Sequence, residues 1–306
     1  MLFRKQSRQR SMTGVYLGHD GLGIATISHQ AGRKAVLEQA SWHATGPDSD
    51  IPGLLGKQIP SNRQMINLVL ADTHYQLLLV EAPRVEPAEL RAALRWKIKN
   101  LIDFHIDDAV IDVFEIPGQQ DRPSGQAMMY VIAARARVIR DHIDRFEQQN
   151  LNLQVIDVNE MALRNLSAQL EEDARGVAML WLDEDHGIIT LTRQTSLYLS
   201  RRLEFGTRTL ASDPQGTADQ ITLEIQRSLD YYDSHFGLPP LAALRIVPGF
   251  TGQFDLANSL DEALALDVAV YNPAQVLDCN SGLDEQAPTG LFLAIGGALR
   301  REEVSL

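Results

Sequence analysis

The sequence predicts an α/β protein with a duplicated two-lobe fold and an inserted αββα subdomain. Segments 14–18, 23–29 and 35–42 alternate or run apolar between turn residues such as the "AGRK" of 31–34, which predicts a three-stranded meander. The same order of elements recurs in the second half of the chain, at 177–182, 187–192 and 197–203. Because helices and single strands follow both meanders, the order of elements indicates a duplicated unit, although the two halves share little sequence.

A change of period separates the two meanders. The runs "MINLVLA" and "YQLLLVEA" continue the strand pattern, but after Pro87 the spacing of Leu90, Leu94, Ile98 and Ile102 draws one helical stripe. Pro87 suits the first turn of a helix, where its missing N–H needs no partner. Two strands and a second helix follow. The predicted division is a basic flexible tail (1–12), the first part of the first lobe (13–81), the inserted αββα subdomain (82–150), the completion of the first lobe (151–175) and the second lobe (176–306).

The composition limits the classes of function. With 306 residues and 44% apolar content, the chain can bury one large core or two ordinary ones. Its net charge of −12 argues against a body that wraps nucleic acid, which needs clustered Lys and Arg. The basic cluster lies in the N-terminal tail, which is either simply disordered or able to contact anionic lipid headgroups; it consists of Arg4, Lys5, Arg8 and Arg10.

Targeting and redox signals indicate the cytoplasm. The chain has no run of about 18 apolar residues and no apolar signal-peptide core at its start. Cys279 is the only cysteine, so neither an internal disulfide nor a CxxC metal site can form. The eight histidines show no H-E-x-x-H spacing and no serine lies in G-x-S-x-G, so the sequence predicts neither a metal site nor hydrolase chemistry.

A glycine-rich stretch, "GVYLGHDGLG" at 14–23, follows the first apolar segment. Glycine lets backbone N–H groups approach an anion closely, so a phosphate loop is one interpretation. Neither G-x-x-x-x-G-K-[ST] nor G-x-G-x-x-G can be read there, however, and no helical pattern follows. Taken alone, the stretch predicts a tight hairpin turn.

Four longer segments carry a resemblance that covers nearly the whole chain: "ELRAALRWKIKNLIDFHIDDAVIDV", "VIDVNEMALRNL", "EIQRSLDYYDSHFGLPPLAALRIVPG" and "FLAIGGALR". In this order they resemble the PilM family of type IV pilus assembly and its MshI relatives of the mannose-sensitive (MSHA) pilus. The resemblance implies an actin-like, ribonuclease H-like fold, in which two lobes enclose a nucleotide between glycine hairpins. It also implies a cytoplasmic location, peripheral to the inner membrane.

The first hairpin of nucleotide-binding relatives reads approximately G-[IV]-D-[IL]-G-[ST], and its Asp helps to order the metal and the attacking water. Tyr16 stands in place of that Asp here, and a phenol does not coordinate Mg²⁺ as a carboxylate does. The resemblance assigns Gly18, Asp20 and Gly21 to this hairpin. Asp20 is either a displaced substitute for the acid or, as we favour, a solvated turn residue.

The second hairpin of the relatives reads D-[IL]-G-A-[ST] and corresponds here to "WLDEDHG", which ends at Gly187. Three consecutive acids, 183–185, stand where small residues normally receive the phosphates. One like-charge pair at about 4 Å costs roughly 4 kcal/mol at an effective dielectric near 20, so a triphosphate is repelled unless a metal intervenes. A metal site made of Asp183, Asp185 and His186 is the alternative to the favoured interpretation, an ordinary acidic hairpin tip.

The adenosine side matches the relatives better. Glu224 and Arg227 lie one turn apart on a predicted helix, in the register by which actin-like proteins reach ribose and adenine, and "PGFTG" places Gly249 beside the base. An exposed i, i+3 ion pair and a strand-ending turn explain the same residues equally well. The expected cofactor is therefore none, or weakly bound ATP with Mg²⁺.

The resemblance also implies a partner. PilM-like proteins capture the N-terminal cytoplasmic peptide of a PilN-like bitopic inner-membrane protein, in a groove between the first lobe and the inserted subdomain. An extended peptide gains backbone hydrogen bonds and a few side-chain pockets in such a groove. The residues expected to face it are Val80, Trp96, Asp157, Glu160 and Leu163, and Trp96 has the alternative of being a core residue.

The function that follows is a cytoplasmic scaffold of type IV (MSHA-type) pilus assembly with a degenerate nucleotide site, which also contacts other platform proteins and no nucleic acid. The rival is an active ATP-binding and ATP-hydrolysing protein, which Tyr16 and the acidic second hairpin oppose. A third candidate is a type II secretion component like the cytoplasmic part of GspL, because a fold alone does not fix a function.

Overall fold

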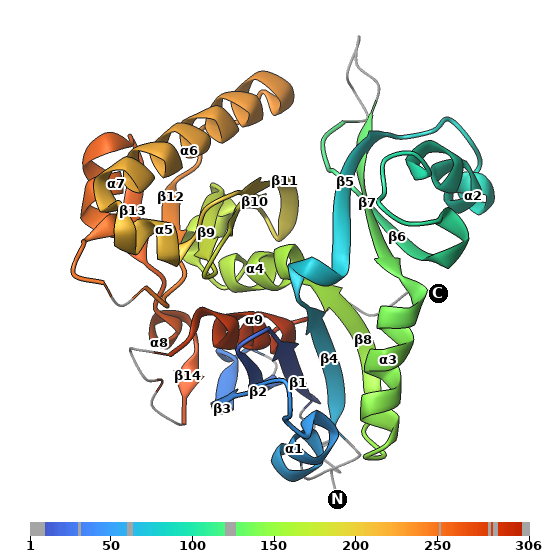
Figure 1. Ribbon diagram of the computed structural model, residues 1–306. Helices are drawn as coiled ribbons and strands as arrows, with labels where there is room; N and C mark the ends of the chain where they lie inside the picture. Colours follow the sequence, from blue (N-terminus) through green and yellow to red (C-terminus); the bar gives the residue numbers. More distant parts are fainter. Residues whose placement is uncertain are drawn as a thin grey trace, which may run out of the picture.

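A computed structural model describes residues 10–29, 32–59, 64–119, 127–250, 252–280, 283 and 287–301. Within these residues, the strands form three β-sheets (Figure 1). Arg4, Lys5 and Arg8 of the predicted basic tail lie outside these residues. Strand β1 begins at Arg10, inside the range predicted for the tail.

The first sheet has six strands in the order β14-β3-β2-β1-β4-β8. Strands β1, β2 and β3 pair antiparallel, as the predicted meander requires, and β4 and β8 continue the sheet in the direction of β1. The bounds are Arg10–Leu17 for β1, Gly21–His29 for β2, Val36–Ala44 for β3, Met65–Leu70 for β4, Leu153–Val158 for β8 and Asp278–Cys279 for β14.

The second sheet repeats this plan in the order β11-β10-β9-β12-β13. Its first three strands are an antiparallel meander, and β12 and β13 run parallel to β9. The bounds are Val177–Leu182 for β9, Gly187–Arg193 for β10, Ser196–Leu203 for β11, Ala243–Ile246 for β12 and Asp267–Val270 for β13. The shared topology is the duplication that the sequence predicted.

The third sheet, β5-β7-β6, carries helices α2 and α3. The bounds are Tyr75–Glu81 for β5, Pro87–Ile98 for α2, Ala109–Glu115 for β6, Met128–Arg135 for β7 and Ala136–Glu147 for α3. The order α2-β6-β7-α3 is the predicted αββα, and Leu94 and Ile98 of the predicted stripe are buried in its core. Strand β5, expected within the first lobe (13–81), pairs with β7 of the third sheet. The alternating pattern of a strand does not tell which sheet the strand joins.

Two helices fill the space between the first and second sheets. Helix α9 (Thr289–Ala298) packs on β1, β2 and β4, and helix α4 (Asn159–Ser167) packs on the second sheet and on α9 (Figure 1). Every residue of α4 is buried, which a helix sandwiched on both sides requires. The backbones come very close, since a Cβ added at Gly296 would lie 2.3 Å from the Ala162 carbonyl oxygen.

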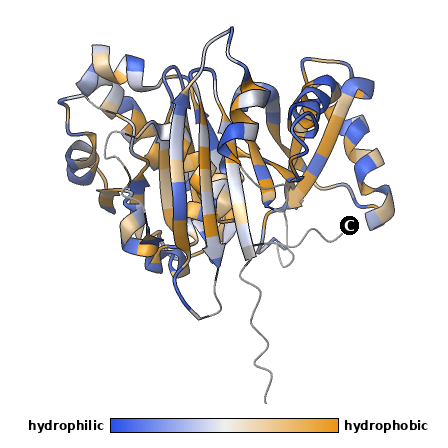
Figure 2. Ribbon diagram, turned by 90° about the horizontal axis from the view of Figure 1, so that it is seen from below, coloured by the Kyte–Doolittle hydropathy of each residue, from blue (hydrophilic) through white to orange (hydrophobic). Residues whose placement is uncertain are grey.

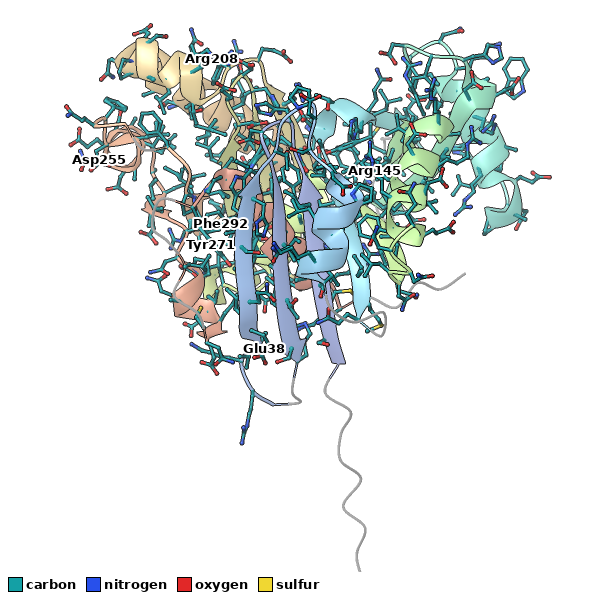
Figure 3. All side chains as sticks on the ribbon, turned by 60° about the horizontal axis from the view of Figure 1, so that its bottom comes forward. Glu38, Arg145, Arg208, Asp255, Tyr271 and Phe292 are labelled. Atoms are coloured by element: carbon teal, nitrogen blue, oxygen red, sulfur yellow. The ribbon has the colours of Figure 1, made fainter. Side chains whose placement is uncertain are left out.

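The end of the chain therefore completes the first sheet. Helix α9 and strand β14 fall in the range predicted for the second lobe (176–306), yet they cover and extend the six-stranded sheet. Phe292 of α9 and Tyr271 lie in the interior, with exposed fractions of 2% and 1% (Figure 3). The division of the chain into domains stays a prediction.

The remaining helices lie outside the sheets. Their bounds are Ile51–Gln58 for α1, Thr207–Ser212 for α5, Pro214–Phe236 for α6, Leu256–Ala263 for α7 and Pro273–Val276 for α8, with 3₁₀ turns at Asp72–His74 (η1), Ile106–Asp108 (η2) and Glu171–Ala174 (η3). Figure 2 shows hydrophobic colour on the central strands and much hydrophilic colour on the outer helices. Within the described part of the chain, no helix has both the length and the apolar character needed to cross a bilayer.

Candidate functional site

The tips of two hairpins, one from each sheet, meet between the lobes. The β1–β2 turn is closed by the Gly18 N–H, which donates to the Gly21 carbonyl at 2.9 Å, and the β9–β10 turn by the Asp183 N–H, which donates to the His186 carbonyl at 2.8 Å. His19 Nε2 lies 3.1 Å from Glu184 Oε2 across the lobes. The two hairpins that correspond to the phosphate hairpins of nucleotide-binding relatives are thus in direct contact with each other.

Tyr16 fills the space behind the first hairpin. Its side chain is 3% exposed, and a Cβ added at Gly18 would lie 2.9 Å from Cε1 of its ring. Burial, together with the negative charges of Asp183, Asp72 and Asp20, raises the pKa of Tyr16 well above its usual value. The phenol therefore stays neutral at physiological pH. A neutral phenol is a poor substitute for the metal-binding carboxylate of an aspartate.

Trp42 of β3 explains one of the predicted glycines. A Cβ added at Gly21 would lie 2.3 Å from the Trp42 ring, and one added at Gly290 of α9 would lie 2.7 Å from the Trp42 and Tyr16 rings. Gly21 is needed because an aromatic ring packs against its backbone. The resemblance places Gly21 in the degenerate nucleotide hairpin, and the sequence pattern does not indicate its packing on Trp42.

The acidic second tip is held by groups of the same chain. The N–H groups of Thr207 and Arg208, at the start of α5, donate to the carbonyls of residues 183 and 184 at 2.8 and 2.9 Å. The Arg208 guanidinium lies 2.7 Å from Glu184 Oε1 and also contacts Asp185 (Arg208 is labelled in Figure 3). The carboxylates that would repel a triphosphate are thus partly neutralised by an arginine that the sequence analysis missed.

A second bridge between the lobes lies beside the hairpins. Asp72, in the turn η1 after β4, has Oδ2 2.6 Å from His186 Nε2 and also contacts Arg202 of β11. Burial alone raises the pKa of Asp72, but the contacts with His186 and Arg202 outweigh it and lower the pKa below its usual value. For Asp183 the balance is reversed, because burial raises its pKa by more than His186, with Nε2 at 3.9 Å, and His19 lower it.

The first bridge has a titratable partner. Burial lowers the pKa of His19, but the hydrogen bond to Glu184 and the charges of Asp183 and Asp20 outweigh this and raise it. Near neutral pH, a larger fraction of His19 is therefore protonated than of a free histidine. A protonated His19 strengthens the contact between the two tips.

The metal alternative is not what the geometry favours. His186 turns toward Asp72, and its Nε2 is 3.9 Å from Asp183 Oδ2, while Asp185 turns toward Arg208. Across the described ranges, no three His, Cys, Asp or Glu side chains converge in a way that holds a metal ion.

The predicted adenosine residues Glu224, Arg227 and Gly249 belong to the range predicted for the second lobe. Glu224 accepts hydrogen bonds from Arg201 of β11 at 2.9 Å and from Arg227 at 2.6 Å, so the i, i+3 ion pair is present with a third member. Gly249 has a φ of +141°, a conformation that favours glycine. Its backbone packs closely against Thr289, since a Cβ added at Gly249 would lie 2.6 Å from Thr289 Cβ. Gly187 likewise begins β10 in close contact with Leu182.

Two grooves flank the third sheet. The β8–β6 groove, of about 780 Å³, runs between edge strand β8 of the first sheet and edge strand β6 of the third, and the β5–β11 groove, of about 610 Å³, runs between β5 and β11. The lining of the β8–β6 groove mixes apolar with polar and charged side chains, and its apolar members include Leu70, Val110, Phe114, Ile132, Ile139, Ile156 and Met161.

The residues predicted to face a partner are not brought together. Asp157 lines the β8–β6 groove, and Glu160 lines the β5–β11 groove, where it accepts a 2.6 Å hydrogen bond from the Tyr75 hydroxyl. Val80 and Leu163 are 4% and 0% exposed, so both are core residues. Trp96 is 73% exposed on the outside of α2, so the alternative that it is core is wrong.

The bridging residues that the sequence analysis did not single out are Asp72, Arg202 and Arg208. Asp72 carried a readable signal, because an acid directly after a buried parallel strand lies at the edge where ligands of α/β sheets gather. The two arginines carried none, since each pairs with a residue from a distant part of the chain.

A family model described as "Type IV pilus assembly protein PilM" matches residues 64–217, half of the chain. No curated protein sequence matches. Among solved structures, the chain is similar to a "PilM-PilN type IV pilus biogenesis complex" (TM-score 0.71, 19% identity, covering 94% of this chain and 97% of that one). It is also similar to the cytoplasmic domain of EpsL, an inner-membrane component of the Vibrio cholerae type II secretion system (TM-score 0.52, 13% identity, 96% of each chain).

A third similar structure, from Bacteroides thetaiotaomicron, is described as having an actin-like ATPase fold (TM-score 0.49, 9% identity, 87% of this chain and 93% of that one). The predicted actin-like fold is confirmed. The similar structures include a component of a secretion system, so the fold alone does not distinguish a pilus protein from a secretion protein. The family match makes this distinction. The chain belongs to the PilM family of type IV pilus assembly proteins.

Proposed function

We propose that the chain is a docking scaffold of type IV pilus assembly, of the MSHA type, that binds the N-terminal cytoplasmic peptide of a PilN-like inner-membrane protein. The β8–β6 groove carries this proposal, because strand edges form both of its walls and apolar side chains line it. The likeness to a PilM–PilN complex supports the choice of partner. The partner holds the scaffold at the cytoplasmic face of the inner membrane, beside the other platform proteins.

An extended peptide suits this groove for a physical reason. Within the described residues, β8 pairs with β4 alone and β6 with β7 alone, so each strand has a row of backbone groups open to a new strand. Two charged pairs in the lining are made within the chain, Arg300 with Asp157 at 2.6 Å and Arg91 with Asp112 at 3.5 Å, and Glu115 and Arg164 also line the groove. We expect backbone pairing and apolar contacts to supply most of the affinity for a peptide.

The test measures the affinity of a synthetic peptide, the N-terminal cytoplasmic segment of the PilN-like protein encoded in the same genome, by fluorescence anisotropy. Val110→Glu places a charge in the groove, and Val270→Glu is the matched control, an exposed valine on edge strand β13 (45% and 52% exposed). We expect V110E to weaken binding by about tenfold or more, the equivalent of roughly 1.4 kcal/mol, and V270E to leave it unchanged.

Two results reject this site. If V110E and V270E bind the peptide equally well, the peptide lies elsewhere. If the wild-type chain does not bind the peptide at all, the scaffold function itself is refuted for this partner. A far-UV circular dichroism spectrum of each variant separates loss of binding from loss of folding.

We further propose that the cleft between the hairpins does not hydrolyse ATP and binds it weakly or not at all. The support is the buried Tyr16 in place of an acid, and the bridges that occupy the tips, His19 with Glu184 and His186 with Asp72. Isothermal titration with Mg-ATP and a phosphate-release assay test this proposal. Metal-dependent binding and turnover of ATP by the wild-type chain would refute this proposal. If Tyr16→Asp did not raise that turnover, the chain would be an active enzyme that needs no acid at position 16.

A further inference from the structure

Helix α2 presents an aromatic side chain to solvent. Trp96 is 73% exposed, and Leu101, just after the helix, is 55% exposed. The other two tryptophans are partly buried (Trp42) or fully buried (Trp181, 0% exposed). The cost of leaving a tryptophan in water makes this position unusual among the large apolar residues of the described chain.

The same segment concentrates positive charge in an acidic protein. Residues 90–102 contain four cations, Arg91, Arg95, Lys97 and Lys99, and no acid, whereas the whole chain has a net charge of −12. The Lys99 ammonium lies 3.8 Å from the centre of the Trp96 ring. These apolar and cationic residues lie together at the end of α2, and we call the surface made of Arg95, Trp96, Lys97, Lys99 and Leu101 the α2 face.

The cations on the α2 face differ in how firmly they are held. Arg95 donates to the Ile106 carbonyl at 2.7 Å and lies 3.4 Å from Asp107, and Lys97 donates to the Glu81 carbonyl at 3.0 Å and lies 3.1 Å from its carboxylate. Lys99 is exposed and contacts the Trp96 ring, so it is the cation of this face that most readily meets an outside anion. Beyond the segment, Glu89 and Asp103 limit the cationic stretch on either side.

We propose that the α2 face docks on an anionic lipid bilayer. Tryptophan prefers the headgroup region, where its ring is partly in apolar surroundings and its N–H stays hydrated, and Leu101 adds apolar contact. The ammonium and guanidinium groups pair with lipid phosphates. A protein partner fits less well, because two exposed apolar side chains fall far short of the roughly 800 Å² per partner of a stable interface.

This docking goes beyond peptide capture and does not depend on it. Arg91 of α2 lines the β8–β6 groove, so a bilayer against the α2 face lies close to the proposed peptide site. A peptide that begins at a membrane-anchored partner has a short path to that groove. The lipid contact is tested without the partner, so failure of one proposal leaves the other standing.

The experiment measures co-sedimentation of the full chain with phosphatidylcholine vesicles, with and without phosphatidylglycerol. We expect binding only with phosphatidylglycerol, weakened several-fold by Trp96→Ala and by about fivefold or more by Lys99→Glu, since each basic residue near an anionic surface contributes about fivefold. The matched controls are Leu223→Ala, an exposed leucine on α6, and Lys57→Glu on α1, which we expect to bind as the wild type does.

A second readout assigns the contact. Emission from Trp96 should shift to shorter wavelength with anionic vesicles, and Trp96→Phe should lose the shift while keeping most of the binding. A triple variant, Arg4→Ser with Lys5→Ser and Arg8→Ser, should still bind, since the N-terminal tail is the competing cationic segment.

Four results overturn the proposal. The first is absence of binding to anionic vesicles, and the second is that Trp96→Ala and Lys99→Glu both bind as well as the wild type does. The third is loss of binding in the tail variant while both α2 variants bind normally. The fourth is an emission shift that depends on protein concentration in the absence of vesicles, which would indicate a second copy on the α2 face. Unchanged melting temperatures for all variants exclude unfolding as the cause of any loss.

Discussion

Replacing Arg300 by Met should destabilise the protein by about 3 kcal/mol, because it strips a buried carboxylate of its cation. Asp157 is 4% exposed, and its Oδ2 lies 2.6 Å from Arg300 Nη1, whose side chain is 16% exposed. Breaking a buried pair by removing one partner costs roughly 3–5 kcal/mol. The lower end applies here, since Asp157 keeps hydrogen bonds from Asn67 Nδ2 at 3.3 Å and from the Val158 N–H at 3.1 Å.

Urea denaturation followed by far-UV circular dichroism measures the free energy of unfolding of four chains: wild type, Arg300→Met, Asp157→Asn and the double variant. The double variant should be more stable than the sum of the two single losses predicts, with an interaction energy of at least about 1 kcal/mol. Arg301→Met is the matched control, because this neighbouring side chain is exposed. Its loss should stay within about 0.5 kcal/mol.

Either of two outcomes refutes this reasoning. A loss below about 1 kcal/mol for Arg300→Met would mean that Asp157 is solvated well enough without its cation. Additive single losses in the double variant would mean that the two side chains stabilise the fold independently. In both cases the Arg300–Asp157 pair in the wall of the β8–β6 groove would contribute less to stability than its 2.6 Å distance indicates.

Three more predictions follow from packing and titration. Gly14→Ala should lower the melting temperature markedly, because its Cβ would lie 1.9 Å from a carbonyl oxygen of α9, whereas Gly46→Ala, with nothing within 4 Å, should not; equal melting temperatures would contradict this. Leu163→Ala should cost about 2–5 kcal/mol of unfolding free energy in urea, and Leu223→Ala, 45% exposed, less than about 0.5, so similar losses would refute the burial argument. Burial lowers the pKa of His142 to about 4, so its neutral form stabilises the fold above pH 6.5 and this contribution, about 3 kcal/mol in full, is lost as the pH falls to about 4. A His142→Gln variant should show a correspondingly flatter loss of unfolding free energy over that range, and an unchanged slope would reject the assignment.

Local pattern was enough to predict the two meanders and the helical stripe of α2. Alternating strands and the spacing of Leu90, Leu94 and Ile98 are properties of neighbouring residues, and both lead directly to buried faces. The prediction for Trp96, a groove residue with the core as its alternative, did not use the same geometry. Two residues after Leu94, Trp96 lies about 200° around the helix and so faces away from the core.

Contacts between distant segments were beyond the reach of pattern. Leu163 is buried because α4 is covered by the second sheet on one side and by α9 on the other, and no feature of its own helix states this. The bridges from His19 to Glu184 and from Asp72 to His186 join parts of the chain that only the folded state brings together. Sequence reasoning found both hairpins but not that their tips touch.

The place of α9 has a consequence for how the protein is made. Strands β1 and β2 leave the ribosome long before the helix that shields their apolar face, α9 at 289–298. The usual rule, in which the N-terminal unit of a nascent chain finishes folding first, does not hold for this architecture. Until α9 is synthesised, the apolar face of β1 and β2 therefore stays uncovered on the growing chain.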